Sequence, residues 1–188
     1  MKRIDALKII DTFFAANPLV ITCGATAREM ASFSRRDLHL PLLDSMGLTS
    51  AIGLGVALGT NDRVGVIDGD GSLLMGFSIL PTLAAYPATN LTIVVLDNGQ
   101  HASADQVPSQ AATIELSGAA EGLGLNTIRC NDAPTLDAAL AQSKSENRFA
   151  MIFVKIEPGN SPDIPLLLAD PAVLAQRFAS AVGSSSQR

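Results

Sequence analysis

The residues best suited to chemistry follow two predicted strands that are joined through a helix. Gly69, Asp70, Gly71 and Ser72 come directly after the strand-like run 63–68, and Asn98 follows the run 91–96. Because the intervening helix returns the chain, both side chains should reach the same edge of the sheet. A carboxylate, an amide oxygen and backbone carbonyls suit a hard cation such as Mg²⁺.

The glycine-rich turn also suits an anion. Gly71 and Ser72 lie at a helix start, where free N–H groups favour a phosphate. Together with the cation ligands they predict a metal-bridged diphosphate site. The alternative is an ordinary strand-to-helix turn in which Asp70 caps a helix.

The elements that must position these residues alternate between strand and helix. Apolar, β-branched runs predict strands at 19–23, 63–68, 91–96, 127–130 and 150–156. Helical spacing predicts helices at 4–14, 26–33, 48–58, 77–86, 114–123 and 134–143, and a terminal helix from Pro171. This alternation predicts an α/β fold with a doubly wound, mostly parallel sheet and helices on both faces.

Three further stretches are expected to be irregular: 37–44, 98–113 and 157–168. The second is a long loop, which in a compact domain usually serves function. Gly53 and Gly55 lie within the predicted helix 48–58, where they lower helix propensity, so we expect both to permit close packing.

Composition limits the classes of protein. The chain has 188 residues, 47% of them hydrophobic, and a net charge of −5. We expect one domain over residues 1–183 and a polar tail over 184–188. High apolar content excludes disorder for most of the chain, and the negative charge argues against a nucleic-acid partner.

Location and metal class follow from a few residues. Two cysteines, Cys23 and Cys130, are too few for a zinc site or a disulfide scaffold and fit a cytoplasmic protein. Charged residues interrupt any signal peptide near the start of the chain. The uncharged stretch 71–96 contains two prolines, so we expect no membrane span.

The turn and the two strands resemble the cofactor motif of thiamine-diphosphate enzymes. Gly69-Asp70-Gly71-Ser72 through Asp97-Asn98-Gly99 carry this resemblance. It implies thiamine diphosphate and Mg²⁺ as cofactors. The implied metal ligands are the side chains of Asp70 and Asn98 and the backbone carbonyl of Gln100.

A second segment resembles the loop that holds the aminopyrimidine in this family. Asp44-Ser45-Met46-Gly47 precedes the small-residue helix 48–58. The resemblance implies that Met46 supports the bent cofactor and that the backbone of Asp44, where the family usually has Gly, contacts the amino group. Taken without the rest of the pattern, Met46 is a core residue that fills a gap.

Other candidates each have two interpretations. The run from Cys23 to Glu29 resembles a diphosphate-side loop, in which Gly24 forms the turn and Thr26 either donates to a phosphate or caps a helix. His101 either binds substrate and moves a proton or is a solvated loop residue. We expect surface positions for His39, for the Arg35-Arg36 pair, and for Arg28 with Glu29.

The resemblance also implies a partner. In this family, a glutamate from a separate pyrimidine-binding domain activates the cofactor, and the chain shows no such domain. An α-type subunit with that domain is therefore expected, in a hetero-oligomer of α2β2 type or larger.

The chain most resembles the sulfopyruvate decarboxylase β-subunit and phosphonopyruvate decarboxylase family, which implies a 2-oxo acid substrate. It departs from that family at 104–109, where those relatives carry a Gly-Gly-Gln-Pro-Thr-like run, and at 163–168, where they carry cationic side chains that are missing here. The second departure leaves a less charged or more apolar 2-oxo acid as an alternative substrate. The alternatives are a carboligase or acyl-transfer enzyme of acetolactate-synthase type, and a non-catalytic cofactor-binding regulatory subunit.

Overall fold

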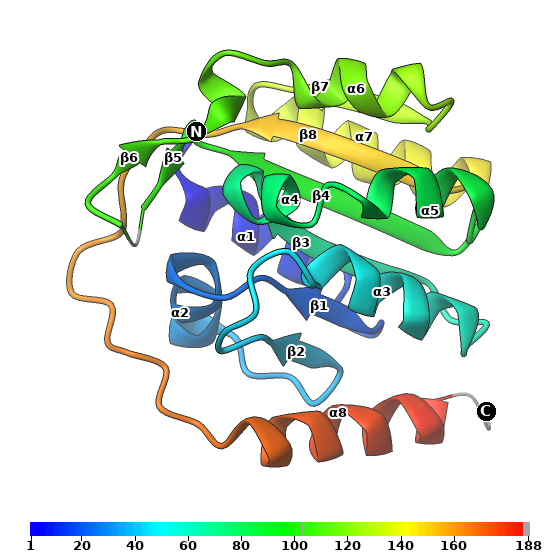
Figure 1. The fold of residues 1–188 in the computed structure, drawn as a ribbon. Helices are drawn as coiled ribbons and strands as arrows, with labels where there is room; N and C mark the ends of the chain where they lie inside the picture. The colour runs from blue at the N-terminus through cyan, green and yellow to red at the C-terminus, as the bar shows by residue number, and fades with distance from the viewer. Residues whose placement is uncertain (103, 186–188) are drawn as a thin grey trace.

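One parallel sheet organises the chain. The computed structural model describes residues 1–102 and 104–185, and its main sheet has the strand order β2-β1-β3-β4-β8-β7 (Figure 1). All neighbouring strands in it run parallel. The strands are β1 (Leu19–Ile21), β2 (His39–Pro41), β3 (Val64–Gly69), β4 (Leu91–Asp97), β7 (Thr127–Cys130) and β8 (Ala150–Lys155). The expected α/β fold is confirmed.

Helices cover both faces of the sheet and form two apolar cores. On one face lie α1 (Arg3–Phe13), α2 (Ala25–Phe33) and α7 (Ala133–Glu146), whose buried side chains meet Ile67, Val94 and Ile152. On the other lie α3 (Thr49–Leu58), α4 (Asp70–Met75), α5 (Ile79–Ala85) and α6 (Leu116–Gly122), packed against Val66, Ile93 and Met151. Because adjacent strand residues point to opposite faces, the central strands are apolar throughout.

The strand order reverses between β1 and β3. From β1 the chain moves outward to β2, and from β3 it moves to β4 on the other side. Ligands in open parallel sheets bind beyond the carboxyl ends of the strands at such a reversal. The site is therefore expected where β1 and β3 end.

The C-terminal segment runs along the outside of the domain. From β8 the chain passes down one side to α8 (Pro171–Ser185), which lies beside the edge strand β2 (Figure 1). Residues 184 and 185 of the expected tail are thus helical, and residues 186–188 lie outside the described part of the chain. Among the residues described, no helix is long and apolar enough to cross a membrane.

Three local predictions were incomplete. The irregular stretch 37–44 contains β2, and the long loop 98–113 contains the hairpin of β5 (Gln100–His101) and β6 (Val107–Pro108) and the 3₁₀ helix η1 (Gln110–Ala112). A separate short helix, α4, precedes α5 where one helix was expected. Strands of two or three residues are too short to show a periodic pattern, and Pro41 is tolerated because β2 is an edge strand.

The two glycines of α3 differ. A Cβ at Gly53 would lie 2.0 Å from Cγ2 of Val66 on β3, whereas a Cβ at Gly55 would meet nothing within 4 Å. The expectation of close packing is therefore right for Gly53 and wrong for Gly55.

His39 was wrongly expected at the surface, since it is 2% exposed. Its Nε2 lies 3.2 Å from the Phe14 carbonyl, and its Nδ1 lies 3.5 Å from an oxygen of Asp11. Asp11 also accepts hydrogen bonds from Nε and Nη2 of Arg36 at 3.0 and 2.9 Å. Burial lowers the pKa of His39, and the positive charges of Arg36 and Arg177 lower it further.

Candidate active site

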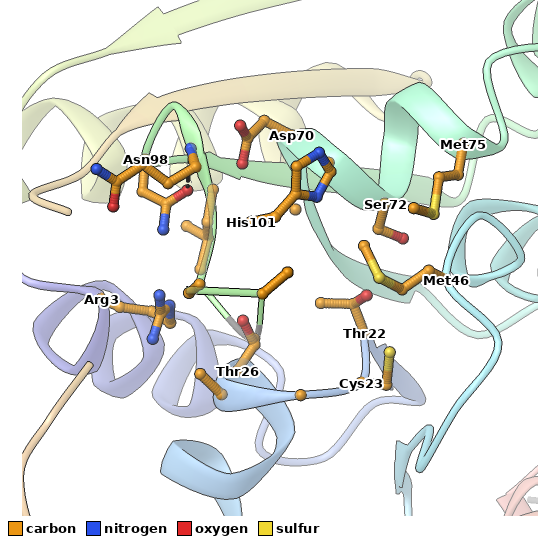
Figure 2. Close-up of a pocket in the computed structure, with 18 of the residues that line it drawn as sticks. Arg3, Thr22, Cys23, Thr26, Met46, Asp70, Ser72, Met75, Asn98 and His101 are labelled. Carbon is orange, nitrogen blue, oxygen red and sulfur yellow. Dashed lines mark hydrogen bonds between the residues drawn. The ribbon is translucent and has the colours of Figure 1, made fainter. Parts of the chain in front are cut away.

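A cavity of about 620 Å³ opens where β1, β3 and β4 end (Figure 2). It lies at the reversal of the strand order. It is lined by every residue expected at the site except Ser45: Gly24, Thr26, Asp44, Met46, Gly69, Asp70, Gly71, Ser72, Asn98, Gln100 and His101. The sequence-based set is thus brought together from four separate segments.

Asp70 and Asn98 meet because β3 and β4 are neighbours. Gly69 pairs in register with Leu96, so Asp70 and Asn98 follow adjacent strand ends. Asp70 is the first residue of α4, and the N-cap position before it is Gly69, which has no side chain to form a cap. The Asp70 carboxylate instead accepts a hydrogen bond from the Ser109 hydroxyl. The interpretation of Asp70 as a helix cap does not hold.

The electrostatics of Asp70 favour a cation. Burial raises the pKa of its carboxyl group, and the charge of Asp97 raises it further, against hydrogen bonds from Ser109 and from the backbone of Gly71 and Asn98. A cation beside this carboxylate would relieve both effects. The donor set of carboxylate and amide oxygens fits Mg²⁺.

The side chains of this chain offer few ligands for a metal ion. In the described residues, no group of three or more His, Cys, Asp or Glu side chains is placed to hold a metal ion. Mg²⁺ is usually held by one or two carboxylates together with phosphate oxygens and water. The arrangement therefore suits a cation that arrives with a diphosphate.

The loop after β4 is shaped by its own side chains. Asn98 Oδ1 accepts a hydrogen bond from Gln100 N at 3.0 Å, and Asp97 Oδ1 accepts one from Gly99 N at 3.0 Å. Gly99 has a φ of +68°, which suits glycine. The Oε1 atom of Gln100 is buried without a hydrogen-bond partner. This unsatisfied acceptor beside the cavity fits a site that receives a polar ligand.

A hydrogen-bond network joins the metal-side turn to the loop of Met46. The Ser72 hydroxyl accepts from Gly47 N at 3.1 Å, and it is also a hydrogen-bond partner of Asp68. Ser50 of α3 donates to Asp68 Oδ2 at 2.7 Å. Burial raises the pKa of Asp68, which is 1% exposed. These contacts fix the geometry of two cavity walls relative to each other.

Met46 lies on the wall opposite Thr26 and is 40% exposed (Figure 2). It is therefore not a core residue that fills a gap. Ser45 does not line the cavity; it has a φ of +71°, and its N–H donates to Asp44 Oδ1 at 3.0 Å. Ser45 thus shapes the turn that presents Met46.

Thr26 lies at the start of α2 and is 7% exposed. The N-cap of α2 is Gly24, at a φ of +76°, and no side chain caps this helix. The capping interpretation of Thr26 does not hold, and its side chain is available to the cavity.

His101 extends into the cavity from β5 (Figure 2). Its ring packs on Gly71, where an added Cβ would lie 2.6 Å from ring atoms. His101 is therefore not a freely solvated loop residue. A side chain at position 71 would displace the His101 ring from this place.

Several lining residues had not been predicted: Arg3, Thr22, Cys23, Met75, Val107 and Ile156 among them. Thr22 and Cys23 follow β1 directly, a position that suggests ligand contact. Burial, with the charge of Asp44, raises the pKa of the Cys23 thiol, so Cys23 stays protonated at neutral pH. No sequence signal indicated Arg3.

Comparisons with known proteins agree with this geometry. The family model for the C-terminal TPP binding domain of thiamine pyrophosphate enzymes matches residues 22–154. Sulfopyruvate decarboxylase subunit beta of Methanothermobacter thermautotrophicus is 35% identical over 187 residues, covering 100% of this chain and 98% of that protein. Phosphonopyruvate decarboxylase of Streptomyces hygroscopicus is 34% identical over 196 residues, covering 98% of this chain and 49% of that protein.

A solved structure shares the fold. Benzoylformate decarboxylase from Polynucleobacter necessarius superposes with a TM-score of 0.67 at 16% identity. The match covers 83% of this chain and 34% of that one.

Proposed function

The chain belongs to the thiamine pyrophosphate enzymes, as a C-terminal TPP binding domain of the sulfopyruvate and phosphonopyruvate decarboxylase family, and from this premise we propose that it is the β-type subunit of a heteromeric 2-oxo acid decarboxylase. One observation carries the proposal above the others. Asp70 and Asn98 follow the ends of adjacent strands and line one cavity, and Met46 faces that cavity from another wall.

Each part of the cavity has a role in this proposal. Thiamine diphosphate, when bound, supplies the electron sink that decarboxylation needs. Mg²⁺ is held by Asp70, Asn98 and the backbone carbonyl of Gln100. The diphosphate is surrounded by the remaining expected residues of this end: Gly24, Thr26, Gly69, Gly71 and Ser72.

The opposite end holds the aminopyrimidine. When the cofactor is bound, Met46 would support this group and the backbone of Asp44 would contact it, with Ser45 fixing the turn. Ser72 also accepts a hydrogen bond from the Gly47 N–H, which links this end to the diphosphate end. His101 faces the substrate and holds or moves a proton there.

The activating glutamate comes from an α-type partner subunit. The acidic residues that line the cavity in the described part of the chain are Asp44 and Asp70, and no glutamate is among them. The chain spans almost all of a relative named as a β subunit but about half of a longer decarboxylase. Both observations support a second polypeptide, in an assembly of α2β2 type or larger. Free Cys23 and Cys130 suit the cytoplasm as its location.

Binding measurements test the cofactor site. Isothermal titration of the chain, with its co-expressed partner, should show binding of thiamine diphosphate that depends on Mg²⁺. Asp70→Ala should abolish this binding, while Asp137→Ala, on the exposed face of α7, should leave it unchanged. Equal binding by both variants would contradict the assignment of Asp70.

Product analysis tests the reaction. The complex should release CO₂ and an aldehyde from a 2-oxo acid. Ligated product alone would show a carboligase instead. Full activity of the complex with Asp70→Ala, despite lost cofactor binding, would show a regulatory subunit. Turnover by this chain in the absence of a second subunit would contradict the partner assignment.

A further inference from the structure

Arg3 is a cationic residue in the cavity wall, although it begins the first helix of the chain. Arg3 is 6% exposed. Nη1 donates to Glu29 Oε1 at 2.9 Å and to Asn160 Oδ1 at 3.2 Å, and Nη2 donates to the Gly159 carbonyl at 3.1 Å. The guanidinium is thus fixed by α2 and by the turn after β8.

Its partner Glu29 was wrongly expected on an exposed helix face, since it is 2% exposed. Glu29 Oε1 also accepts from Ser161 N at 2.9 Å, while Oε2 is buried without a hydrogen-bond partner. The carboxylate therefore holds both the guanidinium and the turn in place. Arg3 and the turn lie outside the residues 22–154 that match the family model.

The charge of Arg3 stands out in the cavity. In the described part of the chain, Arg3 is the one Lys or Arg that lines it, together with the carboxylates of Asp44 and Asp70. A guanidinium has five N–H donors, and the three hydrogen bonds to protein leave two of them. A rigid, always charged fork of this kind recognises phosphate oxygens well.

The position of Arg3 indicates which ligand group it meets. In Figure 2, Arg3 lies at the same end of the cavity as Thr26 and Asn98. Met46 and Met75 lie at the other end. Arg3 therefore belongs to the polar end that also carries metal-side residues, and not to the apolar end.

We propose that Arg3 binds the terminal phosphate of the cofactor diphosphate, and that Glu29 holds the guanidinium in position for it. This inference rests on the proposed function. It adds to the metal site a cationic contact from outside the residues 22–154 that match the family model. Because the guanidinium is already oriented, little side-chain entropy is lost on binding.

The test removes the guanidinium without leaving a buried charge. Loss of Arg3 alone would strand Glu29 and destabilise the fold, so the main variant is Arg3→Gln/Glu29→Gln. Its reference is Glu29→Gln, which keeps the guanidinium. Lys2→Gln is the charge-matched control, because Lys2 is exposed and adjacent in sequence.

Titration calorimetry of the complex with Mg²⁺ and thiamine diphosphate provides a readout apart from activity. We expect the double variant to bind about tenfold to a hundredfold more weakly than Glu29→Gln, the range of a hydrogen bond to a charged group. Thiamine monophosphate should bind both variants with similar affinity. Lys2→Gln should match wild type. If the double variant does not fold, Arg3→Lys keeps the charge but loses the fork, and a several-fold loss is expected.

Two results would overturn this inference and leave the proposed function standing. Unchanged affinity for thiamine diphosphate in the double variant, or in a folded Arg3→Lys where that variant replaces it, would show that Arg3 is structural. Unchanged affinity together with a higher KM for the 2-oxo acid would assign Arg3 to the substrate carboxylate. Failure of wild type to bind thiamine diphosphate would instead overturn the proposed function, and this inference with it.

Discussion

The Ser72 hydroxyl accepts a hydrogen bond from the backbone N–H of Gly47 at 3.1 Å, which joins α4 to the loop of Met46. The segment after α4 and the loop of Met46 also pack closely against each other at Gly76. A Cβ at Gly76 would lie 2.0 Å from the Gly47 carbonyl oxygen. The position of Met46 in the cavity therefore depends on α4, whose first residue is Asp70.

Gly76→Ala should separate these two walls. The added methyl group meets backbone, which cannot rotate away, so the loop of Met46 must shift. A shift of this size near reacting groups lowers kcat about a hundredfold, and far-ultraviolet circular dichroism should show the fold retained. Gly122→Ala is the matched control, because a Cβ there meets nothing within 4 Å. Equal kcat for the two variants would contradict the coupling.

Much of the site followed from the sequence because parallel strands end at one edge. Asp70 and Asn98 each follow a β-branched run, so their meeting needs only the correct strand order. The other residues of 98–102 are placed at the same edge because they follow Asn98 directly in the chain. These predictions use local pattern and topology, and neither depends on detailed packing.

The remaining residues depend on packing that no local pattern records. Arg3 reaches the cavity because α1 packs beside α2. Its partner on α2, Glu29, is 26 residues away in sequence. The His39 ring is buried against the Phe14 carbonyl and Asp11 at the end of α1, which lie 25 or more residues away in sequence. β2 itself has three residues, too few for periodicity to show.

Gly53 and Gly55 should respond in opposite directions to alanine. Gly53→Ala forces a methyl group into Val66 and should lower the free energy of unfolding by about 1–3 kcal/mol. Gly55→Ala adds helix propensity in open space and should raise it by about 0.5–1 kcal/mol. Urea unfolding followed by circular dichroism measures both. Destabilisation by Gly55→Ala would show that its surroundings are not open.

Stability should fall as the pH drops below about 6.5, because of His39. Its folded-state pKa lies below the ordinary value of 6.5, chiefly through burial. Between these two pKa values the unfolded chain binds a proton that the folded chain does not. The free energy of unfolding therefore decreases with falling pH, by at most about 1.4 kcal/mol per pH unit for one group.

His39→Gln should reduce that slope, since glutamine does not titrate. Urea unfolding at several pH values between 7 and 5 gives the slope for both proteins. Asp11 faces His39, but the pKa of its carboxyl group lies below 3.8. The loss of protein stability that comes from protonating Asp11 therefore occurs at lower pH. An unchanged slope in His39→Gln would assign the pH dependence to other groups.

His101→Gln should separate chemistry from cofactor binding. The ring packs on Gly71 and faces the cavity, and the metal is assigned to other groups, the side chains of Asp70 and Asn98 and the backbone carbonyl of Gln100. Loss of a group that holds or moves a proton lowers kcat by about a hundredfold or more. The Kd of thiamine diphosphate should stay within about twofold, because the proposed function assigns the His101 ring to the substrate and not to the cofactor. Asp105→Asn, exposed on the same hairpin at a φ of +50°, is the control and should keep wild-type kcat. A weaker cofactor Kd with unchanged kcat would place His101 among the cofactor-binding residues instead.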